Sequence, residues 1–392
     1  MTSTPIARRT RRAALVVLFL SFVDVFALLP TVAPFATSLG AGPAMLGLIV
    51  GAYSLTNLPA NVVGGVLLDR WGRRRVLLLG LALAAATVAL YPLAGTPGQL
   101  LAARLAHGVA GGILVPAVFT VAGDRSEVGA TGRVMGRLGA AIGAAAVVAP
   151  AGAGVLRQAA GTTAVFLTVS GLLVLGLAVA VVGVHETPSS DGGVPPPPAV
   201  PRVAGGMREL LATPGLRRVL AAVIAMTAAV GVLAAFLPGL VEGLGAPPAA
   251  TGGLFTLYAL VAAGLMLSPA AGSVDRAGPA RPAAAGLLAL AVALALLAVG
   301  ALPLAVVASA VFGLGYGLVF PAVSGAVSVA ATPANRGRAF GLFNAAFSVG
   351  LAAGPTVTGA LTQRLPAIDP FLVPALVCLA VATWTLLRGR KG

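Results

Sequence analysis

Three ionisable residues lie inside long apolar stretches of this sequence, where charged side chains are rare. Asp24 lies in the middle of one stretch, and Arg104 and His107 lie one helical turn apart in another. A charge at the centre of a bilayer costs at least about 2.5 kcal/mol, so such a side chain must face a partner or water. A carboxyl group held away from water favours its protonated form. A carboxylate at this depth is typical of a proton relay, and we predict that Asp24 couples proton movement to another process, with Arg104 and His107 as further candidates.

Each of the three residues also has a purely structural interpretation. Asp24 is then a carboxylate hydrogen-bonded to Ser, Asn or Arg104, and Arg104 extends its guanidinium to the outer end of its helix. His107 is then a hydrogen-bonded packing residue. The substitution Asp24→Asn separates the two interpretations, because an amide keeps the shape of the side chain and does not carry the proton.

The elements that must position these residues are membrane-spanning helices. Of the 392 residues, 58% are hydrophobic and 9% are charged, and the mean hydropathy is +1.02. Soluble proteins carry roughly 25% charged residues and disordered chains are far less hydrophobic, so both classes are excluded. The segments lack the alternation of a β-barrel, and we predict an all-α polytopic membrane protein with twelve transmembrane helices. The predicted spans are 13–37, 44–68, 76–95, 99–123, 134–156, 163–184, 217–239, 249–271, 282–302, 304–330, 339–361 and 370–387.

The basic residues predict the orientation of these spans. The net charge of +15 is spread in short clusters between apolar segments, which indicates membrane orientation rather than binding of nucleic acid. With twelve spans, 22 of the 25 Lys and Arg residues fall on the side of the two termini, and only Arg157 and Arg364 fall on the other side. We therefore predict a multi-pass protein of the cytoplasmic (inner) membrane with both termini cytoplasmic. The arginines before the first span, which lacks a clear small-residue cleavage site, predict an uncleaved first helix.

A central linker and an internal repeat divide the chain into two halves. Residues 186–215 include four consecutive prolines with Gly and Ser, which is typical of a stiff exposed linker. We predict a six-helix bundle over 1–185, a cytoplasmic linker over 186–215 and a second bundle over 216–392. An offset of 205 residues relates Gly132 to Gly337, Pro116 to Pro321 and several other glycines and prolines. Parallel repeats of six helices are typical of transporters whose substrate site lies between the halves.

The loop after the second span carries a recognisable motif. Its glycines and charged residues are Gly65, Asp69, Arg70, Gly72, Arg73 and Arg74. This loop resembles the signature loop of the major facilitator superfamily, and Asp275 and Arg276 stand in a degraded copy in the second half. The resemblance covers the whole chain and implies the major facilitator fold, with two pseudo-symmetric bundles. It also implies that the loop acts as a gate that latches the cytoplasmic side in the outward-open state. The alternative is an ordinary basic turn.

Three further segments resemble motifs of the same superfamily. Arg104 stands four residues before a glycine, as in a fourth-helix motif associated with proton transfer, and His107 stands where that motif usually has glutamine. Many drug/proton antiporters of the superfamily also have an acid in the first helix, the position of Asp24. The fifth and eleventh spans are similar to an antiporter motif of small residues that lets helices bend and approach closely, and this favours export. The bending residues that the resemblance implies are Pro150, Gly154, Gly350, Gly354 and Pro355. Generic small-residue packing is the alternative in a chain with 52 glycines.

The substrate cavity is predicted to be mainly apolar, because the spans contain one clear acid and the chain has only 5% aromatic residues. Such a cavity suits lipophilic compounds better than sugars, whose hydroxyls need many hydrogen-bonding partners. The candidate lining residues are Phe22, Phe26, Tyr53, Asn57, Asn61, Tyr258, Tyr316, Asn344 and Phe347.

Together these features predict a proton-coupled secondary active transporter that exports small lipophilic or drug-like compounds by alternating access. The expected partners are a small-molecule substrate and the lipid bilayer, and the expected oligomeric state is a monomer. We expect no enzyme activity, no cofactor and no metal site, because the chain has no Walker loop, two histidines and a single cysteine, Cys378. A proton gradient is then the energy source. The alternatives are a proton-coupled importer or facilitator of a polar metabolite, and a lipid-handling membrane protein on the same fold.

Overall fold

The computed structural model describes residues 5–123, 131–185, 214–268, 278–330 and 336–389. Within these ranges the chain is helical apart from short turns, and it contains no strand. The first half comprises α1 (Pro5–Ala27), α2 (Val32–Ser38), α3 (Pro43–Trp71), α4 (Arg73–Ala89), the 3-10 helix η1 (Tyr91–Leu93), α5 (Pro97–Gly123) and α6 (Thr131–Gly183). The second half comprises α8 (Pro214–Gly243), α9 (Pro248–Leu267), α11 (Ala280–Ala298), α12 (Leu302–Ala330), α13 (Arg336–Arg364) and α14 (Leu372–Gly389).

Three of the predicted spans differ from separate straight helices. The first is broken after Ala27, so that α1 and α2 form one bent span with an angle of 41°. The fifth and sixth are continuous in α6, where only Gly161 leaves helical dihedral angles, with φ of 82°. Nine described helices are long and apolar enough to cross a membrane, and the bent pair adds a tenth. Division of α6 at Gly161 and the shorter apolar helix Leu372–Leu387 complete twelve, so the predicted all-α membrane fold is confirmed.

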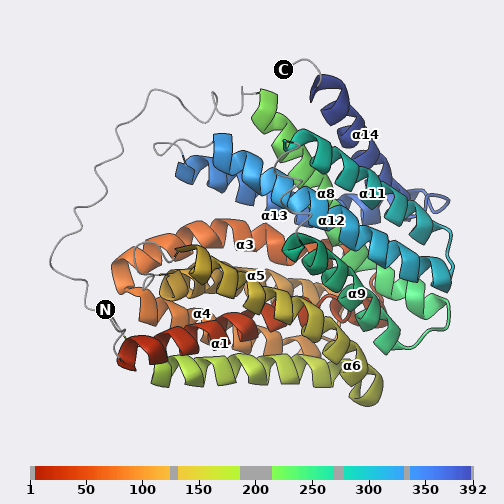
Figure 1. Ribbon diagram of the computed structural model, residues 1–392. Coiled ribbons are helices and arrows are strands. Elements are labelled where there is room, and N and C mark those ends of the chain that lie inside the picture. The colour runs from red at the N-terminus through yellow and green to blue at the C-terminus, as the bar shows by residue number, and fades with distance from the viewer. Residues whose placement is uncertain (1–4, 124–130, 186–213, 269–277, 331–335, 390–392) are drawn as a thin grey trace.

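Each half has its own hydrophobic core, and the two halves pack alike. One core runs from Ala13 to Val184 and the other from Leu216 to Ala382. In the first half α4 contacts α5 and α6, and in the second half α11 correspondingly contacts α12 and α14. Figure 1 shows the two bundles as separate groups of helices that meet along α3, α13, α6 and α9. The predicted linker lies almost entirely outside the described residues.

The halves meet through two helix pairs that the internal repeat relates to each other. α3 packs against α13, and α6 packs against α9. A Cβ atom added to Gly47 of α3 would lie 2.0 Å from the carbonyl oxygen of Pro355, and one added to Gly252 of α9 would lie 2.3 Å from that of Pro150. Backbones approach this closely only where side chains are absent. Because these glycines lack side chains, the backbones of the two halves are in direct contact at one end of the interface. We call this end the closed end.

Polar contacts also join the halves at the closed end. Arg157 of α6 donates from Nη1 to the carbonyl oxygen of Pro30 at 3.0 Å, and its Nη2 pairs with Glu242 of α8 across the interface. The backbone N–H of Ala44 donates to Oε1 of Gln363 at 3.0 Å. Arg157 is buried, whereas the Glu242 side chain is 34% exposed. The ion pair is therefore partly screened by solvent.

The opposite end of the same helices is not packed in this way. A Cβ atom added to Gly139 or Gly143 of α6, or to Gly341 of α13, would meet no atom within 4 Å. Val62 and Val63 of α3 are 69% and 53% exposed. This open end carries the start of α1, the turn between α3 and α4, and the start of α8. The described structure is therefore closed at one end of the half-to-half interface only.

Candidate functional site

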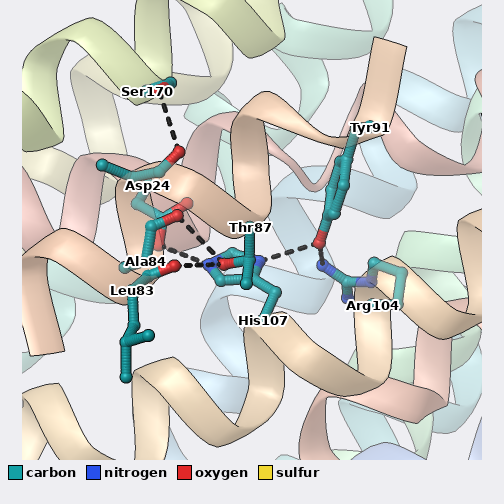
Figure 2. A network of polar contacts seen from close by, with 9 residues as sticks. Asp24, Leu83, Ala84, Thr87, Tyr91, Arg104, His107 and Ser170 are labelled. Atoms are coloured by element: carbon teal, nitrogen blue, oxygen red, sulfur yellow. Dashed lines mark hydrogen bonds and ion pairs between the residues drawn. The ribbon is translucent and has the colours of Figure 1, made fainter. Parts of the chain in front are cut away.

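A chain of buried polar side chains connects α1 to α5. His107 Nε2 lies 2.9 Å from Oδ2 of Asp24, and His107 Nδ1 lies 2.8 Å from the hydroxyl oxygen of Tyr91. Figure 2 shows His107 between these two side chains, with Arg104 beyond Tyr91. His107 and Tyr91 are fully buried and Asp24 is 2% exposed. We call Asp24, His107, Tyr91 and Arg104 the polar cluster.

Local structure explains how these residues meet. Arg104 and His107 are three residues apart in α5 and therefore lie on the same face of that helix. Tyr91 follows the end of α4 and opens the short helix η1, where Pro92 disfavours continuation of the α-helix. Asp24 lies in the last turn of α1 before the break at Leu28. Three separate elements thus contribute to one cluster.

Arg104 is satisfied by several acceptors inside the protein. Its Nη1 donates to the hydroxyl oxygen of Tyr91 at 3.2 Å, and its Nε and Nη2 donate to the carbonyl oxygens of Ile49 and Val50 at 3.3 Å each. The guanidinium carbon also lies 5.3 Å from the ring centroid of Tyr53, a cation–π distance. Arg104 is 8% exposed. The alternative in which it extends to the membrane surface is therefore wrong, and it faces partners as predicted.

The donors and acceptors of the cluster form one consistent sequence if His107 is neutral and Asp24 is ionised. Arg104 donates to Tyr91, the Tyr91 hydroxyl donates to His107 Nδ1, and His107 Nε2–H donates to Asp24 Oδ2. Each of the hydrogens that link Arg104, Tyr91, His107 and Asp24 then has an acceptor. The positive charge of Arg104 and the negative charge of Asp24 balance within the cluster. This arrangement tolerates burial because buried charges must be paired and hydrogen-bonded.

One oxygen of the cluster is left for a further proton. Asp24 Oδ1 is buried and has no hydrogen-bond partner among the described residues. An unpaired carboxylate oxygen is costly to bury, and protonation removes its charge without breaking the bond between Asp24 Oδ2 and His107. The geometry therefore allows the cluster to take up one proton at Asp24.

A cavity of about 120 Å³ lies between the halves beside the cluster. Arg104, His107 and Tyr53 line it, whereas Asp24 does not. Asp24 lies behind His107, because this α1 side chain points into the first bundle. The other lining residues come from α1, the turn after it, α2, α3, α8 and α13, and are Val25, Leu28, Leu29, Val32, Val50, Ser54, Val230, Gly231, Ala234 and Leu351. We call this space the interface cavity.

The other predicted lining residues of the first half lie elsewhere. Phe22 packs against Phe26, with ring centroids 6.1 Å apart, and against Phe119 at 6.2 Å. Asn61 Nδ2 donates to Oδ1 of Asn57 at 2.7 Å, within α3. These four side chains pack or bond within the first half and do not line the interface cavity.

The predicted lining residues of the second half also lie away from the interface cavity. Tyr258 and Tyr316 contact each other edge to face at 5.6 Å. Phe347 packs against Phe343 with centroids 6.4 Å apart, and Asn344 is exposed. Tyr91, Val230 and Gly231 belong to the site but were not predicted from the sequence. Tyr91 lies near the end of the span Arg73–Leu93, and a lone tyrosine there carries no sequence signal for a site.

The predicted gating loop forms a tight turn at the open end. Gly72 has φ of 81°, which favours glycine, and it ends α3 and begins α4. Arg74 donates to the carbonyl oxygens of Val184 and Val181 at 2.8 and 2.9 Å, so it binds within its own half. Asp69, Arg70 and Arg73 are exposed, and a Cβ on Gly65 would meet nothing within 4 Å. Asp275 and Arg276 lie outside the described residues.

The residues that were predicted to bend helices lie where two helices pack closely against each other. The backbone of α6 stays helical through Pro150 and Gly154. A Cβ on Gly154 would lie 3.0 Å from the carbonyl oxygen of Pro248 in α9. One on Gly350 would lie 1.9 Å from Oγ1 of Thr227, and one on Gly354 would lie 2.5 Å from the carbonyl oxygen of Ala228, both in α8. Pro355 contacts α3 at Gly47 and α8 at Gly231. Their role in bending stays a prediction.

Removal of the Tyr91 hydroxyl tests how much the hydrogen bonds of the polar cluster stabilise the protein. Tyr91→Phe leaves a donor of Arg104 and Nδ1 of His107 without their partner in a buried site. We expect a loss of about 1–3 kcal/mol in the free energy of unfolding, because unsatisfied buried polar groups retain their desolvation cost. Unfolding of the protein in detergent measures this change in the free energy of unfolding.

Tyr316→Phe is the matched control for this measurement. Tyr316 stacks on Phe320 and makes no hydrogen bond within the described part of the chain. Its substitution should change stability by less than about 0.5 kcal/mol. Equal effects of the two variants would contradict the assigned hydrogen bonds.

Comparison with known proteins places the chain in a family. The sequence model of the Major Facilitator Superfamily matches residues 14–239 and 219–392. Quinolone resistance protein NorA of Staphylococcus aureus (strain MRSA252) is 23% identical over 173 residues, which are 44% of this chain and 44% of NorA. Multidrug resistance protein 2 of Bacillus subtilis (strain 168) is 23% identical over 137 residues, 35% of this chain and 34% of that protein. The chain thus matches less than half the length of these curated relatives.

Solved structures show the same architecture. A bacterial homolog of the human lysosomal transporter Spinster, in an inward-facing and occupied conformation, superposes with a TM-score of 0.78 over 100% of this chain and 98% of that chain, at 15% identity. The nucleoside transporter NupG superposes with a TM-score of 0.76 over 98% and 97% of the two chains, at 14% identity. These likenesses show the fold alone. With both halves matched by the family model, this chain belongs to the Major Facilitator Superfamily.

Proposed function

We propose that this transporter exports small lipophilic or drug-like compounds in exchange for protons. The observation that carries the proposal is the buried polar cluster, which reaches the interface cavity through His107 and Arg104. A carboxyl group with a free oxygen, an imidazole and an arginine in one hydrogen-bonded chain can accept and release a proton. The cavity lies between the halves, where rocking of the bundles exposes it to each side in turn.

Proton coupling would work through His107 as an intermediate. A proton that enters from the interface cavity reaches the imidazole first, because His107 lines the cavity and Asp24 lies behind it. As His107 Nδ1 takes up that proton, the hydrogen on Nε2 passes to Asp24 Oδ2, so the imidazole ends neutral with its hydrogen on Nδ1, which donates to the Tyr91 oxygen. The Asp24 carboxyl is then neutral and donates to Nε2, and Arg104 is the only charge of the cluster. Neutralisation of Asp24 therefore raises the cost of a cationic substrate beside Arg104 and favours its release. Proton and substrate would thus exchange without contact between the substrate and Asp24.

The described conformation corresponds to the inward-open state in this scheme. The clustering of basic residues at the open end supports a cytoplasmic position for it by the positive-inside rule, and we propose that both termini are cytoplasmic and that the protein lies in the cytoplasmic membrane. Outward opening would part α3 from α13 and α6 from α9, and would bring the open ends together. In that state Asp69 and Arg70, exposed here, would latch the cytoplasmic side, as the family resemblance implies. We further propose that one chain is the working unit.

Arg157 should contribute to the balance between the two states. Arg157→Gln removes the ion pair to Glu242 and weakens the bond to Pro30 at the closed end. Because Glu242 is one-third exposed, we expect a modest shift of about fivefold toward the outward-open state, which corresponds to about 1 kcal/mol. Distances between spin labels on Leu93 and Leu372, which are exposed on opposite halves beyond the closed end, measure it.

A double-mutant cycle isolates the ion pair from other effects. Glu242→Gln alone should give a similar shift, and the double variant should add little to either single variant. Fully additive shifts would mean that the two side chains do not act together.

The substrate class follows from the lining of the interface cavity and from the relatives. Apart from Arg104, His107, Tyr53 and Ser54, the lining side chains are aliphatic or glycine. Pockets for drug-sized ligands measure about 300–1,000 Å³, so we expect the 120 Å³ interface cavity to be the inner part of a larger site that extends toward the open end. The names of the two relatives, a quinolone resistance protein and a multidrug resistance protein, support export of drug-like compounds.

Transport into proteoliposomes tests the direction of coupling. The purified protein is reconstituted, an acid lumen is imposed, and uptake is measured for a panel of lipophilic cations and neutral drugs. Uptake that depends on the pH gradient supports proton antiport, and collapse of the gradient should abolish it. Accumulation only with an alkaline lumen would indicate a symporter instead. Movement of lipid or substrate that ignores the gradient would indicate a facilitator or a lipid-handling protein.

A further inference from the structure

A second and larger cavity lies inside the second half at the open end. Its volume is about 540 Å³, and it is bounded by the start of α8, the start of α11, the end of α12 and Thr385 of α14. It shares no residue with the interface cavity. Its walls are mostly aliphatic and include Leu216, Val219, Ala283, Pro321, Val323 and Val329. We call it the C-half cavity.

The C-half cavity contains one charged group with an unsatisfied donor. Arg218 lines it, and Nη1 of Arg218 is buried without a hydrogen-bond partner among the described residues. A buried guanidinium nitrogen without an acceptor retains its full desolvation cost. Arg218 also lies in the first turns of α8, where unpaired backbone N–H groups carry partial positive charge. Both features favour an anion in the cavity.

The internal repeat shows what fills the corresponding place in the first half. Ala280 of α11 corresponds to Arg74 of α4 at an offset of 206, the spacing that also relates Asp275 to Asp69. Arg74 spans from α4 to the end of α6 and donates to the carbonyl oxygens of Val181 and Val184. Ala280 has no side chain long enough for this contact. The second half therefore keeps a space where the first half has a guanidinium with acceptors.

We propose that the C-half cavity binds an anionic amphiphile, with its acidic headgroup on Arg218 and its alkyl chain along the aliphatic walls of α11 and α12. The volume of 540 Å³ exceeds the needs of a headgroup alone, and aliphatic walls favour a hydrocarbon chain. A carboxylate or phosphodiester oxygen in the cavity would accept a charge-assisted hydrogen bond from the Arg218 guanidinium, and rotation of that group would turn Nη1 toward the ligand. The source is either an anionic phospholipid of the bilayer or a free fatty acid, which share this chemistry.

Native mass spectrometry of the full-length protein in neutral detergent tests the site. The probes are dioleoyl phosphatidylglycerol, oleate, dioleoyl phosphatidylcholine and inorganic phosphate. We expect one molecule of phosphatidylglycerol, of oleate or of each to bind per chain at low probe concentration, and Arg218→Gln to weaken that binding about tenfold or more. Binding of one anionic probe but not the other identifies the source.

Two further variants make the result specific. Arg217→Gln removes the same charge from the adjacent exposed residue and should leave binding unchanged. Gly325→Leu fills the cavity while Arg218 stays in place, because Gly325 lines the cavity and a Cβ there meets no atom within 4 Å. We expect it to exclude the oleoyl chain while the protein stays folded.

Four results would overturn the proposal. The first is binding of phosphatidylcholine as tight as that of the anionic probes, and the second is an equal loss of binding in the Arg217 and Arg218 variants. The third is binding of phosphate as tight as that of the lipids, and the fourth is unchanged lipid binding in Gly325→Leu. None of these results bears on proton coupling, because the C-half cavity and the polar cluster share no residue.

Discussion

Asp24→Asn should abolish proton-driven transport while the protein stays folded. The amide oxygen of Asn still accepts the hydrogen bond from His107 Nε2, which replaces the 2.9 Å contact to Asp24 Oδ2. The variant cannot take up a proton at this position, so the proposed exchange loses its driving step. We expect gradient-driven accumulation in proteoliposomes to fall by about tenfold or more. Exchange of labelled for unlabelled substrate without a gradient should continue.

Two further variants show whether the loss of gradient-driven transport arises from the polar cluster. His107→Gln keeps a hydrogen-bonding side chain beside Asp24 and removes the imidazole ring, so it should reduce driven transport as well. Asp369→Asn removes a carboxylate outside the cluster, where Oδ1 accepts the backbone N–H of Phe371, and an asparagine oxygen accepts the same bond. Its driven transport should equal wild type. Full driven transport by Asp24→Asn would show that the polar cluster is structural.

Gly252→Ala should displace the protein from the described conformation. The new Cβ would lie 2.3 Å from the carbonyl oxygen of Pro150 across the α6–α9 contact, well inside van der Waals distance. The two backbones must separate by about 1 Å, and overpacking of this kind costs about 1–3 kcal/mol. Because the contact exists only while the closed end is shut, we expect a shift of about 5- to 150-fold toward the outward-open state. Spin-label distances between Leu93 and Leu372 should lengthen.

The adjacent residue supplies a matched control. Gly253 lies in the same helix, and a Cβ there meets no atom within 4 Å. Gly253→Ala should leave the label distances unchanged and stabilise α9 slightly, since alanine favours a helix over glycine by about 1 kcal/mol. If Gly252→Ala and Gly253→Ala give the same distances, the α6–α9 contact does not hold the closed end.

Several features of the site were predictable from single residues. A buried charge needs a partner wherever it lies in a membrane, so Asp24, Arg104 and His107 could be identified before their partners were known. Of the predicted lining residues, Tyr53 lines the interface cavity, and the place of the others in a larger site stays a prediction. Aromatic and amide side chains in a span satisfy packing or local hydrogen bonds equally well, as Asn57 and Asn61 do with each other.

The sequence by itself determined the helical class, the spans and the internal repeat, because hydropathy and turn chemistry act over neighbouring residues. Tertiary structure alone decided that Tyr91 joins Arg104 to His107 and that Asp24 lies behind His107. It also decided that glycines of α3 and α9 close one end of the interface while those at the other end stay open. Such contacts join residues far apart in the chain, and their geometry depends on how the helices rotate and cross. That rotation is set by the packing of all twelve helices together and leaves no pattern in a single segment.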